Sequence, residues 1–166
     1  MLSCKELRDA FVYRDGNLYW ARKTGSMAAG SLAGNFRDDG YVRIKFKRRL
    51  FLVHIMIWVY HGRDIPDGYE LDHINGDQTN NRIENLRLAT HSENGFNAKI
   101  PSHSTSGHKG VSKRKGTNKW RAYITVNQRR RYLGTFGTIE EATAVRNAAA
   151  FATFGQFARE THEGGD

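Results

Sequence analysis

The chain has 166 residues and a formal net charge of +9 at pH 7, and its length fits one medium domain or two small ones. A single cysteine, Cys4, excludes an intramolecular disulfide and a cysteine-rich zinc cage, and it favours a reducing compartment. The first residues lack the apolar core of a signal peptide, and no apolar run approaches the roughly 20 residues of a membrane span. We therefore expect a soluble, intracellular protein with no membrane partner.

The charge falls into three blocks. Residues 1–53 contain 11 Lys/Arg and 5 Asp/Glu, residues 54–94 contain 3 and 7, and residues 95–138 contain 10 and none. An acidic centre between two basic flanks suggests a metal-binding catalytic core with arms that bind a polyanion. A solvated basic surface without a ligand is the alternative, and the complete absence of acid from the third block argues against it.

Residues 1–52 are predicted to form a β-rich arm. A short amphipathic lead-in covers residues 1–10. The following segment, FVYRDGNLYW at 11–20, has β-prone runs on both sides of Asp15 and Gly16. This residue pair is typical of a tight hairpin turn.

Residues 40–52 alternate apolar and basic side chains, which predicts a half-buried strand with a cationic face. The basic residues of that face are Arg43, Lys45 and Lys47. Arg48 and Arg49 would turn the chain into a second short strand. The face could follow a DNA backbone, although strands also expose lysines where no ligand binds.

Residues 53–61 form a continuous apolar run that ends at Gly62. Strand and helix cannot be separated by periodicity over so short a length, and the glycine, which resembles a helix C-cap, favours a helix. His54 lies at the start of this run. A histidine in an apolar segment is more often a hydrogen-bonded structural residue than a ligand.

The central segment is predicted to fold as strand, loop, strand and helix. Residues 69–74 and 83–88 are the strands, and the turn-rich loop between them is dense in Asn, Asp and Gly. Thr90 and Glu93 have the spacing of a capping box. Asn94 then lies one turn inside the helix.

Hydrolysis of a phosphodiester needs an activated water, charge neutralisation at phosphorus and a stabilised leaving oxygen. Mg²⁺ prefers oxygen ligands and keeps several waters, so Asp72 and Asn94 would suffice as its protein ligands. His73 could accept a proton near neutral pH. Because neighbours on a strand point to opposite faces, Asp72 and His73 can serve one site only if the strand end is bulged or bent.

The segment from Val53 to Lys99 resembles an HNH (ββα-metal) endonuclease of the phage homing type. The matching words are VHIMIWVYHG, IPDGYELDHINGD, NNRIENLRLAT and the SEN that opens the helix. The resemblance implies that Asp72 is a metal ligand and His73 the general base. It further implies that Asn85 supports the histidine and the loop, that Asn94 is the second metal ligand, and that each active site uses one Mg²⁺ or Mn²⁺ ion.

The chain after the polar linker at 100–107 is predicted to form a separate module. Three strands are expected at 110–114, 120–126 and 130–136, followed by a helix at 139–153 that a Thr138–Glu141 capping box begins. Small or apolar residues are expected to pack this helix on the sheet: Ala142, Val145, Ala148, Ala149 and Ala152.

Residues 108–158 resemble an AP2 DNA-binding domain, through SGHKGVSKRKGTNKWRAYI, RRYLGTFGTIEEATAVRNAAA and FGQFA. The resemblance implies that the sheet meets a DNA major groove. The matching DNA-binding positions are Arg114, Arg121, Arg130 and Tyr132. Ser112, Tyr123 and Thr125 depart from the plant domains, so the plant target sequence does not carry over. Trp120 is more simply explained as a core aromatic.

We expect an α+β protein with an arm at 1–52, a nuclease core at 53–99, the AP2-like module and a disordered tail at 159–166. Its expected function is metal-dependent hydrolysis of double-stranded DNA, by a monomer or a homodimer. The resemblance implies the cytoplasm of a bacterial or phage-infected host. A non-catalytic sequence-specific DNA-binding regulator and an RNA-binding protein are the alternatives. The roles of His54, His91 and Asn97 stay open.

Overall fold

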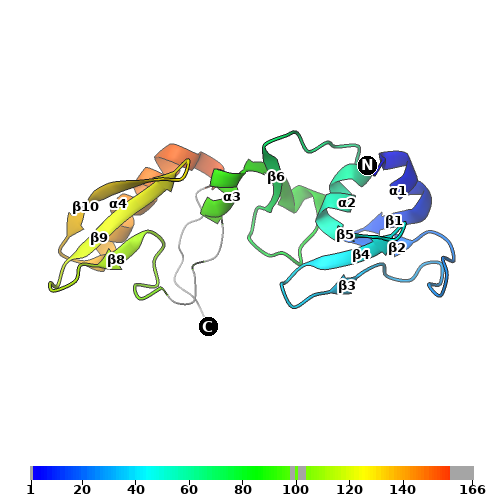
Figure 1. The fold of residues 1–166 in the computed structure, drawn as a ribbon, viewed down its shortest axis with the longest axis horizontal. Coiled ribbons are helices and arrows are strands. Elements are labelled where there is room, and N and C mark those ends of the chain that lie inside the picture. Colours follow the sequence, from blue (N-terminus) through cyan, green and yellow to red (C-terminus); the bar gives the residue numbers. More distant parts are fainter. Residues whose placement is uncertain (1, 98–99, 101–103, 158–166) are drawn as a thin grey trace. The chain divides into compact units, whose positions relative to one another are not determined.

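The structure is a computed structural model that describes residues 2–97, 100 and 104–157. The chain contains both helices and antiparallel strands, which agrees with the predicted α+β class (Figure 1). The contacts divide the chain into two compact units, Met1–Ala89 and Thr90–Asp166. The predicted tail at 159–166 lies outside the described residues, as do residues 101–103 of the predicted linker. Within the described part, none of the helices has the length and apolar character needed to cross a membrane.

The first unit begins with a helix and a hairpin. Helix α1 (Cys4–Ala10) leads into the antiparallel strands β1 (Phe11–Arg14) and β2 (Asn17–Trp20). Asp15 and Gly16 form the turn with φ values of 46° and 82°. Two positive φ values match the right-handed twist of a hairpin, and the predicted hairpin is confirmed.

A three-stranded antiparallel sheet follows, in the order β3-β4-β5. Its strands are β3 (Asn35–Phe36), β4 (Val42–Phe46) and β5 (Arg49–Leu52). Lys47 and Arg48 form the turn between the last two strands, with φ values of 48° and 63°. The predicted turn was one residue too late, because Arg49 already pairs with Phe46 in the ladder.

Residues 53–60 form a helix, α2 (Val53–Tyr60), as predicted. Gly62 follows it with a φ of 75°, the left-handed conformation that ends a helix. The arm and this helix share one hydrophobic core. Its largest fully buried side chains are Leu7, Phe11, Leu18, Ile44, Met56 and Ile57. The arm is therefore part of the platform that holds the central segment.

The central hairpin consists of β6 (Tyr69–His73) and β7 (Leu86–Thr90). The predicted strand at 83–88 was wrong at its start, because Ile83–Asn85 forms a turn of 3₁₀ helix. In this turn the Asn85 carbonyl accepts from the Ile74 amide at 2.8 Å. The bond closes the loop at its base, so the second strand begins only at Leu86.

The second unit contains α3 (His91–Asn97) and a three-stranded antiparallel sheet in the order β10-β9-β8. The strands are β8 (Val111–Lys113), β9 (Trp120–Val126) and β10 (Arg129–Phe136). Helix α4 (Ile139–Phe154) follows, and a 3₁₀ turn at Gly155–Phe157 comes after it. The three predicted strands, the helix and the Thr138–Glu141 capping box are confirmed.

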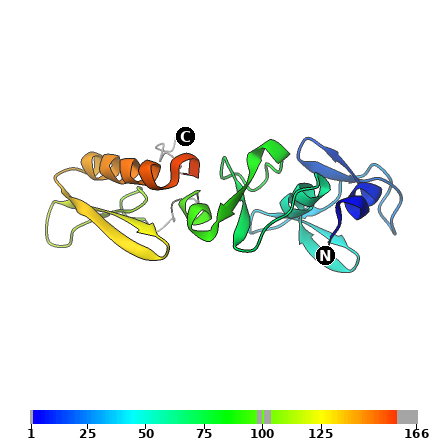
Figure 2. The same cartoon turned by 90° about the horizontal axis from the view of Figure 1, so that it is seen from above.

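Helix α4 covers one face of this sheet (Figure 2). Its buried residues are Ala142, Arg146 and Ala150. The predicted packing face was wrong for Val145, Ala148 and Ala152, which are exposed. Arg146 explains the error, because the stem of its side chain lies close to Gly110. A Cβ placed on Gly110 would be only 3.2 Å from Arg146 Cγ. A sequence pattern assigns an arginine to solvent, whereas this side chain packs its stem on the sheet.

Candidate active site

Asp72 and His73 are the last two residues of β6, and both are only 5% exposed. The chain turns directly after them, where the Gly76 amide donates to the His73 carbonyl at 2.8 Å. Their contacts lie on different elements, since Asp72 contacts β7 and His73 contacts α2. Both sides of the strand end are therefore covered by protein.

Asp72 forms an ion pair with Arg87 on β7. Both the Nε and Nη2 of Arg87 lie 2.9 Å from Asp72 Oδ2, and the two side chains are 12% and 6% exposed. A buried carboxylate needs such a partner to offset its lost hydration. Arg87 is absent from the residues predicted for the site. The signal that could have found it is a basic residue on the strand that pairs with β6.

His73 is held by a side chain that the sequence reading also missed. Its Nε2 lies 3.0 Å from Asn81 Oδ1, and Asn81 is only 3% exposed. The ring of His54, on α2, meets the His73 ring edge to face, with 5.0 Å between centroids. Tyr41 lies on the same cluster, at 6.4 Å from the His73 centroid. The imidazole is thus fixed from several directions.

His54 is 5% exposed. Burial, together with repulsion from His73, lowers the pKa of His54 to about 4. The ring is therefore neutral at pH 7. His54 is a structural residue of the His73 pocket, which fits the structural role expected for a histidine in an apolar segment.

Asn85 holds the loop between the two strands. Its Nδ2 donates to the Asn80 carbonyl at 2.7 Å and to Asn75 Oδ1 at 3.0 Å, while its Oδ1 accepts from the Asn75 amide at 3.1 Å. This geometry agrees with the expected support of the loop. The imidazole of His73 is bonded by Asn81 instead.

Asn94 lies in α3, one turn after the N-cap. The cap is the predicted box: Thr90 donates through its amide and Oγ1 to Glu93 Oε2, at 2.7 and 2.8 Å. Asn94 belongs to the second unit, so its pairing with Asp72 stays a prediction. Asn97, at the end of the same helix, is 3% exposed.

The predicted donor set of Asp72 and Asn94 would suit a hard cation that keeps most of its own waters. The described residues contain no group of three or more His, Cys, Asp or Glu side chains that could hold a metal. Asp72 offers a carboxylate and Asn94 an amide oxygen, the ligand types that Mg²⁺ and Mn²⁺ favour. The described residues form no cysteine and histidine cluster of the kind that binds structural zinc.

The cationic face predicted on β4 is partly neutralised. Arg43 forms an ion pair with Asp39, and Lys47 forms one with Glu6. The Lys47 hydrogen bond, with help from Ser3, lowers the pKa of Glu6 to about 2. Lys45, on the same strand, is exposed. DNA binding by this face would have to compete with the two surface ion pairs.

In the second unit, the outer face of the sheet brings together three of the predicted DNA-binding residues. Arg121 pairs with Ser112 and Thr135, Tyr123 with Tyr132, and Thr125 with Arg130 in the strand register. The Arg130 guanidinium lies 3.4 Å from the Tyr123 ring centroid, and Tyr132 is 64% exposed. Trp120, in contrast, packs on the hydrophobic core. The contact with DNA stays a prediction.

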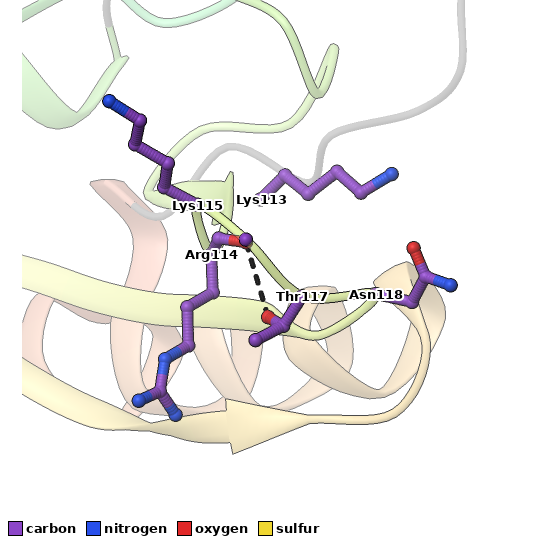
Figure 3. Close-up of a pocket in the computed structure, with 6 residues that line it drawn as sticks. Lys113, Arg114, Lys115, Thr117 and Asn118 are labelled. Carbon is purple, nitrogen blue, oxygen red and sulfur yellow. Dashed lines mark hydrogen bonds between the residues drawn. The ribbon is translucent and has the colours of Figure 1, made fainter.

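Arg114 belongs to the turn between β8 and β9. This turn forms an open hollow of about 480 Å³ (Figure 3). The residues that line it are Lys113, Arg114, Lys115, Gly116, Thr117 and Asn118. Thr117 Oγ1 donates to the Arg114 carbonyl at 3.1 Å and holds the turn together. Three cationic side chains therefore line this hollow, from the end of β8 and the turn that follows it.

Comparisons with known proteins find similarity over the segment that carries Asp72 and His73. The HNH endonuclease family model matches residues 51–96. Protein 3.8 of Escherichia phage T7 is 44% identical over 73 residues, 44% of this chain and 60% of that protein. The uncharacterized HNH endonuclease L560 of Acanthamoeba polyphaga mimivirus is 34% identical over 94 residues, 57% of this chain and 48% of that protein.

Among solved structures, the HNH homing endonuclease I-HmuI, studied for DNA binding and cleavage, is 26% identical with a TM-score of 0.46. The match covers 58% of this chain and 55% of that chain. The chain thus spans about half the length of the relatives that it matches. The family match includes Asp72, His73, Asn85 and Asn94 within its limits. The similarity to the HNH endonuclease family therefore covers residues 51–96 of this chain.

Proposed function

We propose that this chain is a homing-type endonuclease that hydrolyses phosphodiester bonds of double-stranded DNA with the help of a divalent cation. The observation that carries the proposal is the buried His73, held by Asn81 and His54 directly after the paired Asp72. This arrangement lies within the segment that matches the HNH endonuclease family.

His73 acts as the general base in this proposal. A neutral imidazole can take a proton from water as that water attacks phosphorus, provided that its ring is already oriented. The bond from Asn81 and the packing of His54 and Tyr41 supply this orientation. Asn85 contributes indirectly, because it holds the loop that carries Asn81.

Asp72 and Asn94 would hold one Mg²⁺ or Mn²⁺ ion. When bound, the ion would neutralise charge on the phosphate and stabilise the leaving oxygen. Arg87 contacts Oδ2 of Asp72 and fixes the orientation of the carboxylate. It thereby restricts how Asp72 can present an oxygen to a ligand.

The AP2-like module would position the protein on the duplex. Arg121, Arg130 and Tyr132 share one exposed sheet face, and Arg114 extends the basic surface into the next turn. Arginines on such a face contact phosphates more often than bases. We assign this module to placement on DNA, by a monomer or a homodimer.

Plasmid cleavage tests the proposal. Supercoiled plasmid incubated with the full chain and Mg²⁺ or Mn²⁺ should be nicked or linearised, and EDTA or His73→Ala should abolish the products. His61→Ala is the matched control, because His61 contacts Tyr13 and Tyr60 and belongs to no part of the site. Binding to the plasmid without cleavage would contradict the proposal and leave a non-catalytic DNA-binding regulator.

A further inference from the structure

The chemistry of His73 depends on which of its two ring nitrogens carries the proton. We infer that Asn81 is a positioning residue that fixes His73 as the Nε2-protonated tautomer, so that Nδ1 is the basic nitrogen. The part of this inference that concerns water activation rests on the proposed function.

The orientation of the Asn81 amide decides the tautomer. Asn81 Nδ2 donates to the Thr79 carbonyl at 3.3 Å. A flipped amide would place Oδ1 against that carbonyl, and two acceptors would then face each other. The amide oxygen therefore faces His73.

The bond to His73 then has only one direction. Asn81 Oδ1 lies 3.0 Å from His73 Nε2, and an amide oxygen can only accept a hydrogen bond. Nε2 must therefore carry the hydrogen. A neutral imidazole has one N–H, so the lone pair that can take a proton from water is on Nδ1.

Packing alone could fix neither the ring orientation nor the tautomer. His54 and Tyr41 hold the plane of the His73 ring, but the terminal torsion of a histidine has two broad minima that exchange each ring nitrogen with a ring carbon. The Asn81 bond distinguishes the two. Both partners are at most 5% exposed, so water cannot easily replace a lost acceptor.

Asn81 is itself held by the loop around it. Asp77 Oδ1 accepts from the Thr79 amide and Oγ1, at 2.9 and 2.7 Å. Asn85 Nδ2 binds the Asn80 carbonyl, next to Asn81 in the chain. The Asn-rich loop thus holds the Asn81 amide in place, and that amide orients the His73 ring.

Three variants separate the positioning role from a purely structural one. Asn81→Leu replaces the acceptor with an apolar group of the same branched shape. Asn81→Asp keeps an oxygen acceptor for Nε2 but loses the donor to the Thr79 carbonyl. Asn80→Leu is the matched control, because among the described residues the Asn80 side chain accepts only from the Arg82 amide, at 3.4 Å. The Asn80 carbonyl that Asn85 binds is retained in that control.

Ring ¹⁵N NMR of the full chain, at a pH where His73 is neutral, reads the tautomer directly. Wild type, Asn80→Leu and Asn81→Asp should show a protonated Nε2, whereas Asn81→Leu should show a mixture of tautomers. A protonated Nδ1 in the wild type would overturn the inference, even if Asn81→Leu failed to fold. An Nε2-protonated ring in folded Asn81→Leu would overturn it too.

Cleavage kinetics provide the second readout. Asn81→Leu should lower kcat about 10- to 100-fold, the usual range for a residue that orients a reactive group, and Asn81→Asp should restore part of the loss. If the wild type does not cleave but shows the Nε2-protonated ring, the proposed function fails and the tautomer assignment stands. If folded Asn81→Leu cleaves like the wild type, the positioning role is wrong.

Discussion

The buried ion pair between Asp72 and Arg87 contributes to stability as well as to the geometry of the site. Arg87→Gln would leave a carboxylate that is 6% exposed without its cation. Breaking such a pair costs about 3 kcal/mol or more. We expect urea unfolding to show a loss of that order.

The exposed pair between Arg43 and Asp39 is the matched control for this prediction. Its side chains are 29% and 46% exposed, and exposed pairs contribute about 1 kcal/mol or less. Arg43→Gln should therefore change the free energy of unfolding little. Equal losses in Arg87→Gln and Arg43→Gln would mean that burial of the Asp72 pair has no energetic consequence.

His54 should make the first unit sensitive to acid. Its folded pKa of about 4 is below the ordinary histidine value of 6.5, so the unfolded chain takes up a proton first as the pH falls. The contribution of His54 to the free energy of unfolding is fully present above pH 6.5 and is lost as the pH falls towards 4. At 1.36 kcal/mol per pKa unit, the loss is about 3 kcal/mol. His54→Phe should flatten this slope in unfolding titrations, and an unchanged slope would contradict the assignment.

The sequence identifies the residues that we propose to be reactive, but not the residues that orient them. Asp72 and His73 are adjacent in the chain, and the family resemblance marks them. Asn81 is one of several amides in a loop rich in Asn and Asp, and only the folded loop shows that it reaches His73. Arg87 is hidden for the same reason, since the pairing of β6 with β7 brings it to Asp72.

Among the elements, those fixed by local chemistry were predictable. The Asp15-Gly16 turn and the Thr138 capping box depend on neighbouring residues alone. The start of β7 depends on a bond between Asn85 and Ile74 across the loop. The packing face of α4 depends on the long stem of Arg146, which no hydrophobic pattern includes.

Gly110 and Gly116 test the packing of the second sheet. Both residues have a positive φ, at 70° and 74°. A Cβ on Gly110 would lie 2.4 Å from the Tyr123 carbonyl oxygen, whereas a Cβ on Gly116 would have no atom within 4 Å. Gly116→Ala should cost about 1 kcal/mol from backbone strain. Gly110→Ala should cost roughly 2 kcal/mol more, because the backbone must also shift. Thermal unfolding would measure both, and equal costs would contradict the close approach.

For the molecule as a whole, binding to duplex DNA should depend on one face of the second sheet. Arg130 is exposed opposite Thr125, and the next residue, Arg131, alternates to the other face, opposite Ile124. Arg130→Gln should weaken duplex binding and reduce the slope of log K against log salt by about 1. Arg131→Gln is the matched control, and an equal loss in both would indicate a diffuse basic surface instead.

The most direct test of the central claim is single-turnover cleavage of a labelled DNA duplex by the full chain in Mg²⁺, compared with folded His73→Ala. A general base contributes about 10²- to 10⁴-fold to rate. We predict a loss of that size in His73→Ala, with DNA binding unchanged. Cleavage by His73→Ala at the wild-type rate, or no metal-dependent cleavage by the wild type, would contradict the account.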